Sequence, residues 1–376
     1  MRARQAGARP APKRRRRGGG PAGAAALLAS FSLFATACSP LYLLRAGYEE
    51  ARILWHRRPI EEVLARPGVD GARRKKLEIV LDARRFAVNE LGFRRGESYQ
   101  SIVELAQPPT VHVVSAAYRH RLEPYTWWFP VIGRVAYKGF FSERPAASEV
   151  EKLEARGYDT YVRTAATFST LGWFADPLFP HLLNYDEVTL ANVVFHELFH
   201  ETFYRAGQTA FNESLANFAG SRAAIDFFLA REGPHGKRYR EAVAAWEDEL
   251  GFAAFLREAA QRLRACYDSS KSGEEALAGR EEVFAGLKQE FGRLTFHTRS
   301  NGEFARERLN NAVLLHYLLY RQELDLFEDV YRRTGGGLRQ ALDRIIALAR
   351  EAQSPFDAVR DGVEKSADTQ APAAAS

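Results

Sequence analysis

The chain of 376 residues is long enough for one or two domains, and its 46% hydrophobic and 27% charged residues are the ordinary proportions of a globular protein. These proportions exclude a disordered chain, a collagen-like fibre and a polytopic membrane protein, and two cysteines are too few for a disulfide-stapled fold or a cysteine-rich zinc module. The net charge of +6 comes from the amino terminus. Without residues 1–37 the chain has 45 basic and 47 acidic residues, a net charge of −2, so the composition gives no reason to expect nucleic-acid binding.

Residues 1–37 have the three parts of a secretory signal peptide. Residues 1–17 are rich in arginine, residues 21–37 are uncharged and mostly apolar, and small residues come directly before Cys38. A segment of 17 residues is at the short end of what spans a bilayer, which leaves an uncleaved membrane anchor as the alternative.

The segment resembles a bacterial lipoprotein signal, although Ala35 stands where such signals usually have leucine. The resemblance implies cleavage before Cys38, a lipid on Cys38 that binds the membrane, and a mature protein that faces the periplasm. By resemblance to Gram-negative sorting, Ser39 implies the outer membrane. Lipidation would leave Cys266 without an intramolecular disulfide partner, and we expect Cys266 to be a small buried residue.

Helical patterns run from about residue 45 to residue 100, with a break at Pro67 and Gly68. Strand candidates, where β-branched and aromatic residues are concentrated, follow over residues 111–115, 131–141 and 158–168. The chain is helix-rich after about residue 186, and a last helix is expected over 338–351, after three consecutive glycines.

These patterns predict an α+β fold in which a small antiparallel sheet precedes a predominantly helical half. We expect one catalytic domain over residues 38–363. Residues 364–376 are polar and predict a disordered tail, because they cannot bury enough apolar surface to become ordered.

The most informative residues are His196-Glu197-Leu198-Phe199-His200, which lie in a run of about 20 residues without proline or glycine. Residues four apart lie on one face of a helix, so His196 and His200 can bind one metal ion, and Glu197 can reach a water on that ion without being a ligand. A buried, metal-free pair of histidines is the alternative. The apolar neighbours argue against it, since an unpaired Glu197 among them would be costly.

Glu213 offers a third ligand. It lies 13 residues after His200, in the first turn of a second predicted helix that follows a break at Gly207. The two helices would form a hairpin, and Glu213 could then point back at His196 and His200. Two histidines and one glutamate with an open fourth position are the composition of a catalytic zinc site, with one Zn²⁺ per chain. The helix dipole alone also favours an acidic residue at this position.

These motifs resemble the gluzincin branch of the zinc metallopeptidases, in which HExxH is followed by a glutamate ligand from a second helix. Together with residues 161–179, they are similar to a bacterial aminopeptidase family over most of the chain after Cys38. The resemblance implies a zincin-like fold, a peptide substrate and zinc. Thermolysin-like members have an aspartate four residues after the glutamate ligand that orients a ligand histidine. Asn217 stands there, and it can accept the same hydrogen bond without adding charge.

The corresponding mechanism gives each residue a role. Glu197 would accept a proton from the attacking water and deliver it to the leaving amine. A further donor would stabilise the oxyanion, and the candidates are Tyr204, Tyr317 and Tyr320, each of which could instead only pack. We expect the substrate to pair with an edge strand over residues 161–169.

Three interpretations remain open. The first is a lipid-anchored, periplasm-facing zinc peptidase that acts as an aminopeptidase. The second is a zinc endopeptidase on the same residues. The third is a non-catalytic envelope lipoprotein with a structural metal site, although such a site would have no use for Glu197 and would usually close its fourth coordination position.

Overall fold

The computed structural model describes residues 40–105, 110–129, 133–164, 176–298 and 302–370. The predicted signal peptide, Cys38 and the last six residues of the predicted tail lie outside these ranges, as do residues 165–169 of the expected substrate strand. Within the described ranges, no helix has both the length and the apolar character needed to span a bilayer.

The amino-terminal part is mostly helical, as predicted. Its elements in chain order are α2 (Pro40–Trp55), β1 (Arg57–Pro59), α3 (Ile60–Ala65), α4 (Gly71–Asn89) and β2 (Ser101–Val103). Asp70 caps α4 by accepting a hydrogen bond from the main-chain N–H of Arg73 at 2.9 Å. The antiparallel pair β1–β2 was not predicted, because strands of three residues show no measurable alternation.

A three-stranded antiparallel sheet forms the centre of the strand-rich part, with β3 (His112–Tyr118) between β6 (Tyr137–Phe140) and β7 (Tyr158–Thr164). The predicted strand over residues 131–141 is two strands in the structure, because β5 (Gly133–Val135) pairs with β4 (Trp127–Phe129) and β6 pairs with β3. The other two strand predictions are confirmed as β3 and β7, and β6 and β7 are the sheet's edges.

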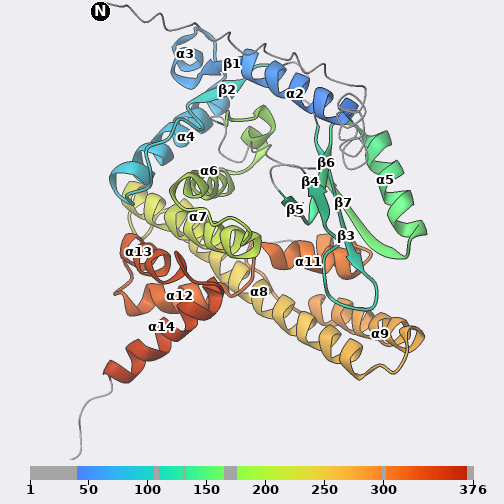
Figure 1. Cartoon of the computed structure of the whole chain (residues 1–376). Coiled ribbons are helices and arrows are strands. Elements are labelled where there is room, and N and C mark those ends of the chain that lie inside the picture. Colours follow the sequence, from blue (N-terminus) through green and yellow to red (C-terminus); the bar gives the residue numbers. More distant parts are fainter. Residues whose placement is uncertain (1–39, 106–109, 130–132, 165–175, 299–301, 371–376) are drawn as a thin grey trace, which may run out of the picture.

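The two faces of this sheet are covered by different helices (Figure 1). Val114 and Phe140 pack with Leu153 of α5 (Glu143–Ala155) on one face. On the other face, the ring of Tyr161 lies 5.1 Å from the ring of His316 in α11 (Asn311–Leu319). Because side chains alternate along a strand, Tyr137 and Arg163 share the face of Tyr161.

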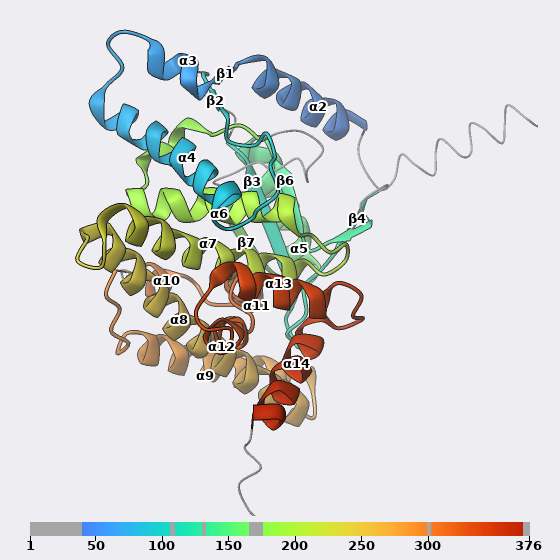
Figure 2. The ribbon, with the colours of Figure 1, turned by 90° about the vertical axis from the view of Figure 1, so that its left-hand side faces the viewer.

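The helical half is built around two neighbouring antiparallel helices, α6 (Glu187–Thr202) and α7 (Thr209–Glu232), which lie side by side in both views (Figures 1 and 2). The 3₁₀ turn η1 (Pro180–Asn184) leads into α6. The remaining helices are α8 (Lys237–Ser269), α9 (Gly273–Phe291), α10 (Gly302–Arg306), α12 (Leu324–Arg333), α13 (Leu338–Ala349) and α14 (Pro355–Gln370). The fold is therefore of the predicted α+β class.

Two details of the helical half differ from the predictions. The sequence predicts a disordered tail from Glu364, but α14 continues to Gln370. The first turns of this helix are anchored by the buried Val359, and residues 364–370 continue it. Cys266 in α8 is half-buried, and a Cβ added to Gly279 of α9 would lie 2.8 Å from its sulfur. Cys266 therefore lies at the edge of the contact between α8 and α9.

Candidate metal centre

The turn between α6 and α7 is fixed by polar contacts. Asp186 caps the start of α6 by accepting from the N–H of Thr189 at 2.8 Å. At the other end, Gly207 adopts φ +77°, a conformation that favours glycine, and the Asn212 side chain accepts from Arg205 N at 2.9 Å and donates to Arg205 O at 2.7 Å. These contacts set the direction in which α7 returns along α6.

A close contact between the two helices depends on Gly220. A Cβ at this position would lie 2.9 Å from the main-chain oxygen of Asn192 and 3.1 Å from the nitrogen of His196. Only a residue without a side chain lets the backbones come this close. The helix that carries Glu213 is thereby held against the helix that carries the two histidines.

The predicted ligands converge. The Nε2 atoms of His196 and His200 lie 3.1 Å apart, and Glu213 Oε2 lies 3.4 Å from the first and 3.6 Å from the second. The three side chains are partly buried, with between 14 and 21% of their surface exposed. The three donor atoms form a nearly equilateral triangle, so the group could hold one metal ion.

The electrostatics of the triangle also suit a cation. Burial by itself would raise the pKa of Glu213, but hydrogen bonds with His196 and His200 lower it overall, so this carboxylate stays ionised. Burial would lower the pKa of His200, but the adjacent Glu213 raises it overall. The three side chains therefore form a partly buried place where positive charge is stabilised.

Glu197 directly follows His196 on α6, and its charge acts on three tyrosines. Its negative charge contributes to raised pKa values at Tyr99, Tyr137 and Tyr320, where burial is the larger cause. Each of these hydroxyls therefore keeps its proton at neutral pH and is available as a hydrogen-bond donor. Tyr99 is fully buried and has φ +60°, a conformation that is uncommon for a residue with a side chain.

The structure separates the three tyrosines proposed as oxyanion donors. The ring of Tyr320 lies 6.2 Å from the ring of His196, beside the triangle. Tyr317 packs instead with Phe252 and Phe304 in a second hydrophobic core. Tyr204 is 55% exposed, and the charge of Glu213 adds to the effect of burial in raising its pKa.

Asn217 does not have the hydrogen bond expected of it. Its Nδ2 donates to the main-chain oxygen of Tyr320 at 2.9 Å, whereas Nδ1 of His200 is buried and has no hydrogen-bond partner in the described part of the chain. The side chain of Asn217 lies one helical turn beyond Glu213 and meets the end of α11. Asn217 therefore contacts the Tyr320 segment, and no hydrogen bond joins it to His196 or His200 within the described residues.

Three residues near the centre were missed in the sequence. Tyr99 follows a loop after α4, Tyr137 lies on β6, and Arg163 lies on β7, where its Nη2 donates to the Tyr320 hydroxyl at 3.4 Å. None of them belongs to a motif with a fixed spacing. For Tyr137 and Arg163, the only available signal was a strand pattern, which does not say which face of the sheet meets α11.

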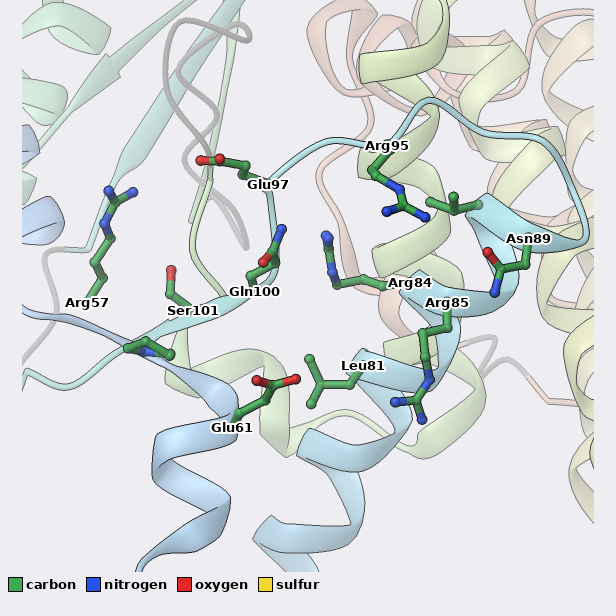
Figure 3. Close-up of a pocket in the computed structure, with 12 residues that line it drawn as sticks. Arg57, Glu61, Leu81, Arg84, Arg85, Asn89, Arg95, Glu97, Gln100 and Ser101 are labelled. Carbon is green, nitrogen blue, oxygen red and sulfur yellow. The ribbon is translucent and has the colours of Figure 1, made fainter.

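Two cavities lie near these elements. One, of about 430 Å³, has Tyr137 and Arg163 in its wall. The other, of about 710 Å³, lies between α4 and the β1–β2 pair, and four arginines and two glutamates surround it (Figure 3). Neither wall contains His196, His200 or Glu213, but Arg163 in the wall of the smaller cavity donates to the hydroxyl of Tyr320, whose ring lies beside the triangle. The smaller cavity is therefore the candidate for a substrate pocket.

Comparison with known proteins gives one match. Neither the curated proteins nor the solved structures show a similar chain. The model of one family, described as “Putative aminopeptidase”, matches residues 41–357, a span that includes both α6 and α7. On this match, the chain belongs to that aminopeptidase family.

Proposed function

We propose that this protein is a zinc-dependent peptidase that removes residues from the amino end of peptides. The observation that carries the proposal is the triangle of His196, His200 and Glu213 with Glu197 next to it on α6. The family match supports peptidase activity, and the triangle supports the metal.

The distances in the triangle suit zinc. Bonds of about 2.0–2.2 Å in a tetrahedral site place neighbouring donor atoms roughly 3.3–3.6 Å apart. The observed separations are 3.1, 3.4 and 3.6 Å. When bound, a zinc ion would act as a Lewis acid toward the scissile carbonyl and lower the pKa of a water molecule toward about 7.

The chain's own residues supply the proton transfers and the orientation. Glu197 would accept a proton from the attacking water and pass it to the nitrogen of the leaving amine. The Tyr320 hydroxyl, which keeps its proton, would donate to the oxygen on which negative charge develops. Arg163 donates to the oxygen of that same hydroxyl, so the single hydroxyl proton points away from the guanidinium. The edge strand β7 would hold an extended substrate by main-chain pairing.

We also propose that the protein is attached to the membrane through a lipid on Cys38 and faces the periplasm, at the outer membrane. The support is the sequence of residues 1–39 alone. A Cys38→Ser variant should move from the membrane fraction to the soluble fraction. Unchanged fractionation would show that the segment is an uncleaved anchor instead.

The function is tested with the Glu197→Gln variant. It should bind one zinc ion per chain, as the parent does, and should lose hydrolysis of unblocked peptides by at least about 100-fold. An active Glu197→Gln protein would refute the assigned base. Peptides with a free amino terminus, compared with the same peptides acetylated there, separate an aminopeptidase from an endopeptidase. A zinc-loaded parent that cleaves neither would favour the structural metal site.

A further inference from the structure

Within the described residues, Arg163 is a cation without a charged partner. Its Nη2 donates to the Tyr320 hydroxyl, and its Nε is buried without a hydrogen-bond partner in the described residues. No ion pair involves Arg163 within that part of the chain, in contrast to Arg321 nearby, which pairs with Glu249 at 2.7 Å. A guanidinium that is half-buried without a counter-charge is unfavourable, which is unusual for a residue whose role is only structural.

The tyrosines and the histidine around Arg163 are neutral. Its positive charge acts on the tyrosines Tyr137, Tyr161 and Tyr320, whose pKa values remain raised above the ordinary value because burial dominates. Burial, together with the charges of Arg163 and Arg321, lowers the pKa of His316 to about 3, so this imidazole is neutral as well. The nearby negative charge of Glu213 belongs to the metal-binding triangle. The guanidinium therefore retains an unbalanced positive charge.

This charge faces a cavity. Arg163 and Tyr137 contribute to the wall of the space of about 430 Å³ between the sheet, α8 and α11. Aliphatic residues, among them Ala116, Leu122, Ala136, Ala253, Ala260 and Leu315, make up just over half of the remaining wall. The wall also includes Arg257, Arg321 and Glu323, each of which has an ion-pair partner, and the exposed Arg264. The volume of this cavity is near the lower end of the range for small-ligand sites. The cavity can therefore hold a few residues of a peptide but not a long extended chain.

We propose that Arg163 binds the free carboxylate at the C-terminus of a short peptide whose last side chain occupies this aliphatic cavity. The proposal rests on the function proposed above and adds the class of substrate. A planar guanidinium matches a carboxylate in geometry and binds it through two parallel hydrogen bonds. Since Arg163 also contacts Tyr320, the same residue would link recognition of the C-terminus to the position of the catalytic hydroxyl.

The proposal predicts that peptides with a free C-terminal carboxylate are hydrolysed better than their amides, a preference that a neutral site would not have. The test compares kcat/KM for three tripeptides: alanyl-alanyl-phenylalanine as the free acid, the same peptide as its amide, and alanyl-alanyl-aspartic acid amide. The parent should hydrolyse the free acid at least about 10-fold better than its amide, the usual effect of one charge-assisted contact. A comparable rate for the aspartic acid amide would assign the site to acidic side chains and overturn the C-terminal assignment.

Three variants distinguish recognition of the carboxylate from effects on folding and on the position of Tyr320. Arg163→Gln should abolish the preference for the free acid, even if the contact to Tyr320 lowers kcat for every peptide, and Arg163→Lys should restore part of that preference. Arg134→Gln, a change of an exposed arginine on β5 outside the cavity, should leave the preference at the parent's value. Retention of the full preference in Arg163→Gln would overturn the inference.

The experiments distinguish a wrong carboxylate site from a wrong peptidase function. If the parent hydrolyses acid and amide equally, the peptidase function holds and the carboxylate site is wrong. If the zinc-loaded parent hydrolyses neither, the function is wrong, and calorimetric titration with the free-acid tripeptide decides the inference. Binding at least about 10-fold weaker in Arg163→Gln than in the parent would support it, and equal or undetectable binding would overturn it.

Discussion

The side-chain amide of Asn217 donates to the main-chain oxygen of Tyr320 at 2.9 Å and so joins α7, the helix that carries Glu213, to the residue beside the candidate metal-binding triangle. Ser214 on the same helix adds two contacts, since its hydroxyl donates to Leu319 O at 3.2 Å and accepts from Gln322 N at 3.0 Å. The segment that carries Tyr320 is thus held by the helix that supplies Glu213.

Asn217→Ala should therefore impair catalysis and leave metal binding intact. Without the amide the Tyr320 segment is less well positioned, and we expect kcat to fall by about 10-fold with an unchanged zinc content. Asn217→Asp keeps the shape but removes the donor, so kcat should fall in this variant too. Weakened zinc binding in Asn217→Ala together with full activity in Asn217→Asp would instead favour the role of orienting a histidine.

Tyr320→Phe should show the role of the hydroxyl itself. Loss of a donor to the developing oxyanion typically costs about 10²–10³ in kcat, whereas zinc binding should be unaffected. Tyr317→Phe and Tyr204→Phe are the comparison variants, since one residue packs in the second core and the other is largely exposed. A similar loss in Tyr204→Phe, with an active Tyr320→Phe, would transfer the donor role to Tyr204.

Gly96 provides a test of how the loop before Tyr99 packs on α6. A Cβ at Gly96 would clash with Oε2 of Glu201, an atom that is buried without a hydrogen-bond partner in the described chain. Gly96→Ala should lower the unfolding free energy by about 1–3 kcal/mol, through overpacking. Glu201→Ala should suppress that loss in the double variant.

The matched control for this change is Gly71→Ala, because a Cβ at Gly71 meets no atom within 4 Å. Its midpoint in urea should be equal to that of the parent or slightly higher, because alanine is favoured over glycine in a helix and meets no atom at this position. Additive effects of Gly96→Ala and Glu201→Ala would mean that the two positions do not share a contact.

Asp226 on α7 should make the stability depend on pH. Burial raises its pKa to about 6, and Arg222 only partly opposes the shift. The native state then holds a proton that the unfolded chain releases near pH 4, so this group's contribution to stability falls as the pH rises from about 4 to 6 and stays low above that range.

Asp226→Asn should remove this penalty. We expect an unfolding free energy higher by about 1–3 kcal/mol at pH 7, and no gain at pH 4, where the parent's carboxyl is already protonated. Thermal unfolding of both proteins at the two pH values measures the effect. An equal gain in unfolding free energy at pH 4 would mean that the stabilisation does not come from removing the charge of Asp226.

The candidate metal centre was predictable from the sequence because its parts are local. His196 and His200 share one face of a single helix, and Glu213 follows a short turn whose geometry is set by nearby residues such as Asn212. Their spacing in the sequence was therefore enough to identify the three side chains as one group.

The surroundings of the centre were not predictable in this way. Arg163 and Tyr137 reach it from strands, and their positions depend on strand register and on which face of the sheet meets α11. Tyr320 was one of three equal candidates until the packing of Tyr317 and the exposure of Tyr204 distinguished them. Such relations depend on tertiary packing, which leaves no periodic signal in the chain.

The most direct test of the central claim is a calorimetric titration of the metal-stripped protein with zinc. The parent should bind one ion per chain, His196→Ala should lose this binding, and Glu213→Gln should bind at least about 100-fold more weakly, because each removes one donor of the triangle. Binding in Glu213→Gln as tight as in the parent would contradict the account, since the helix α7 would then contribute no ligand.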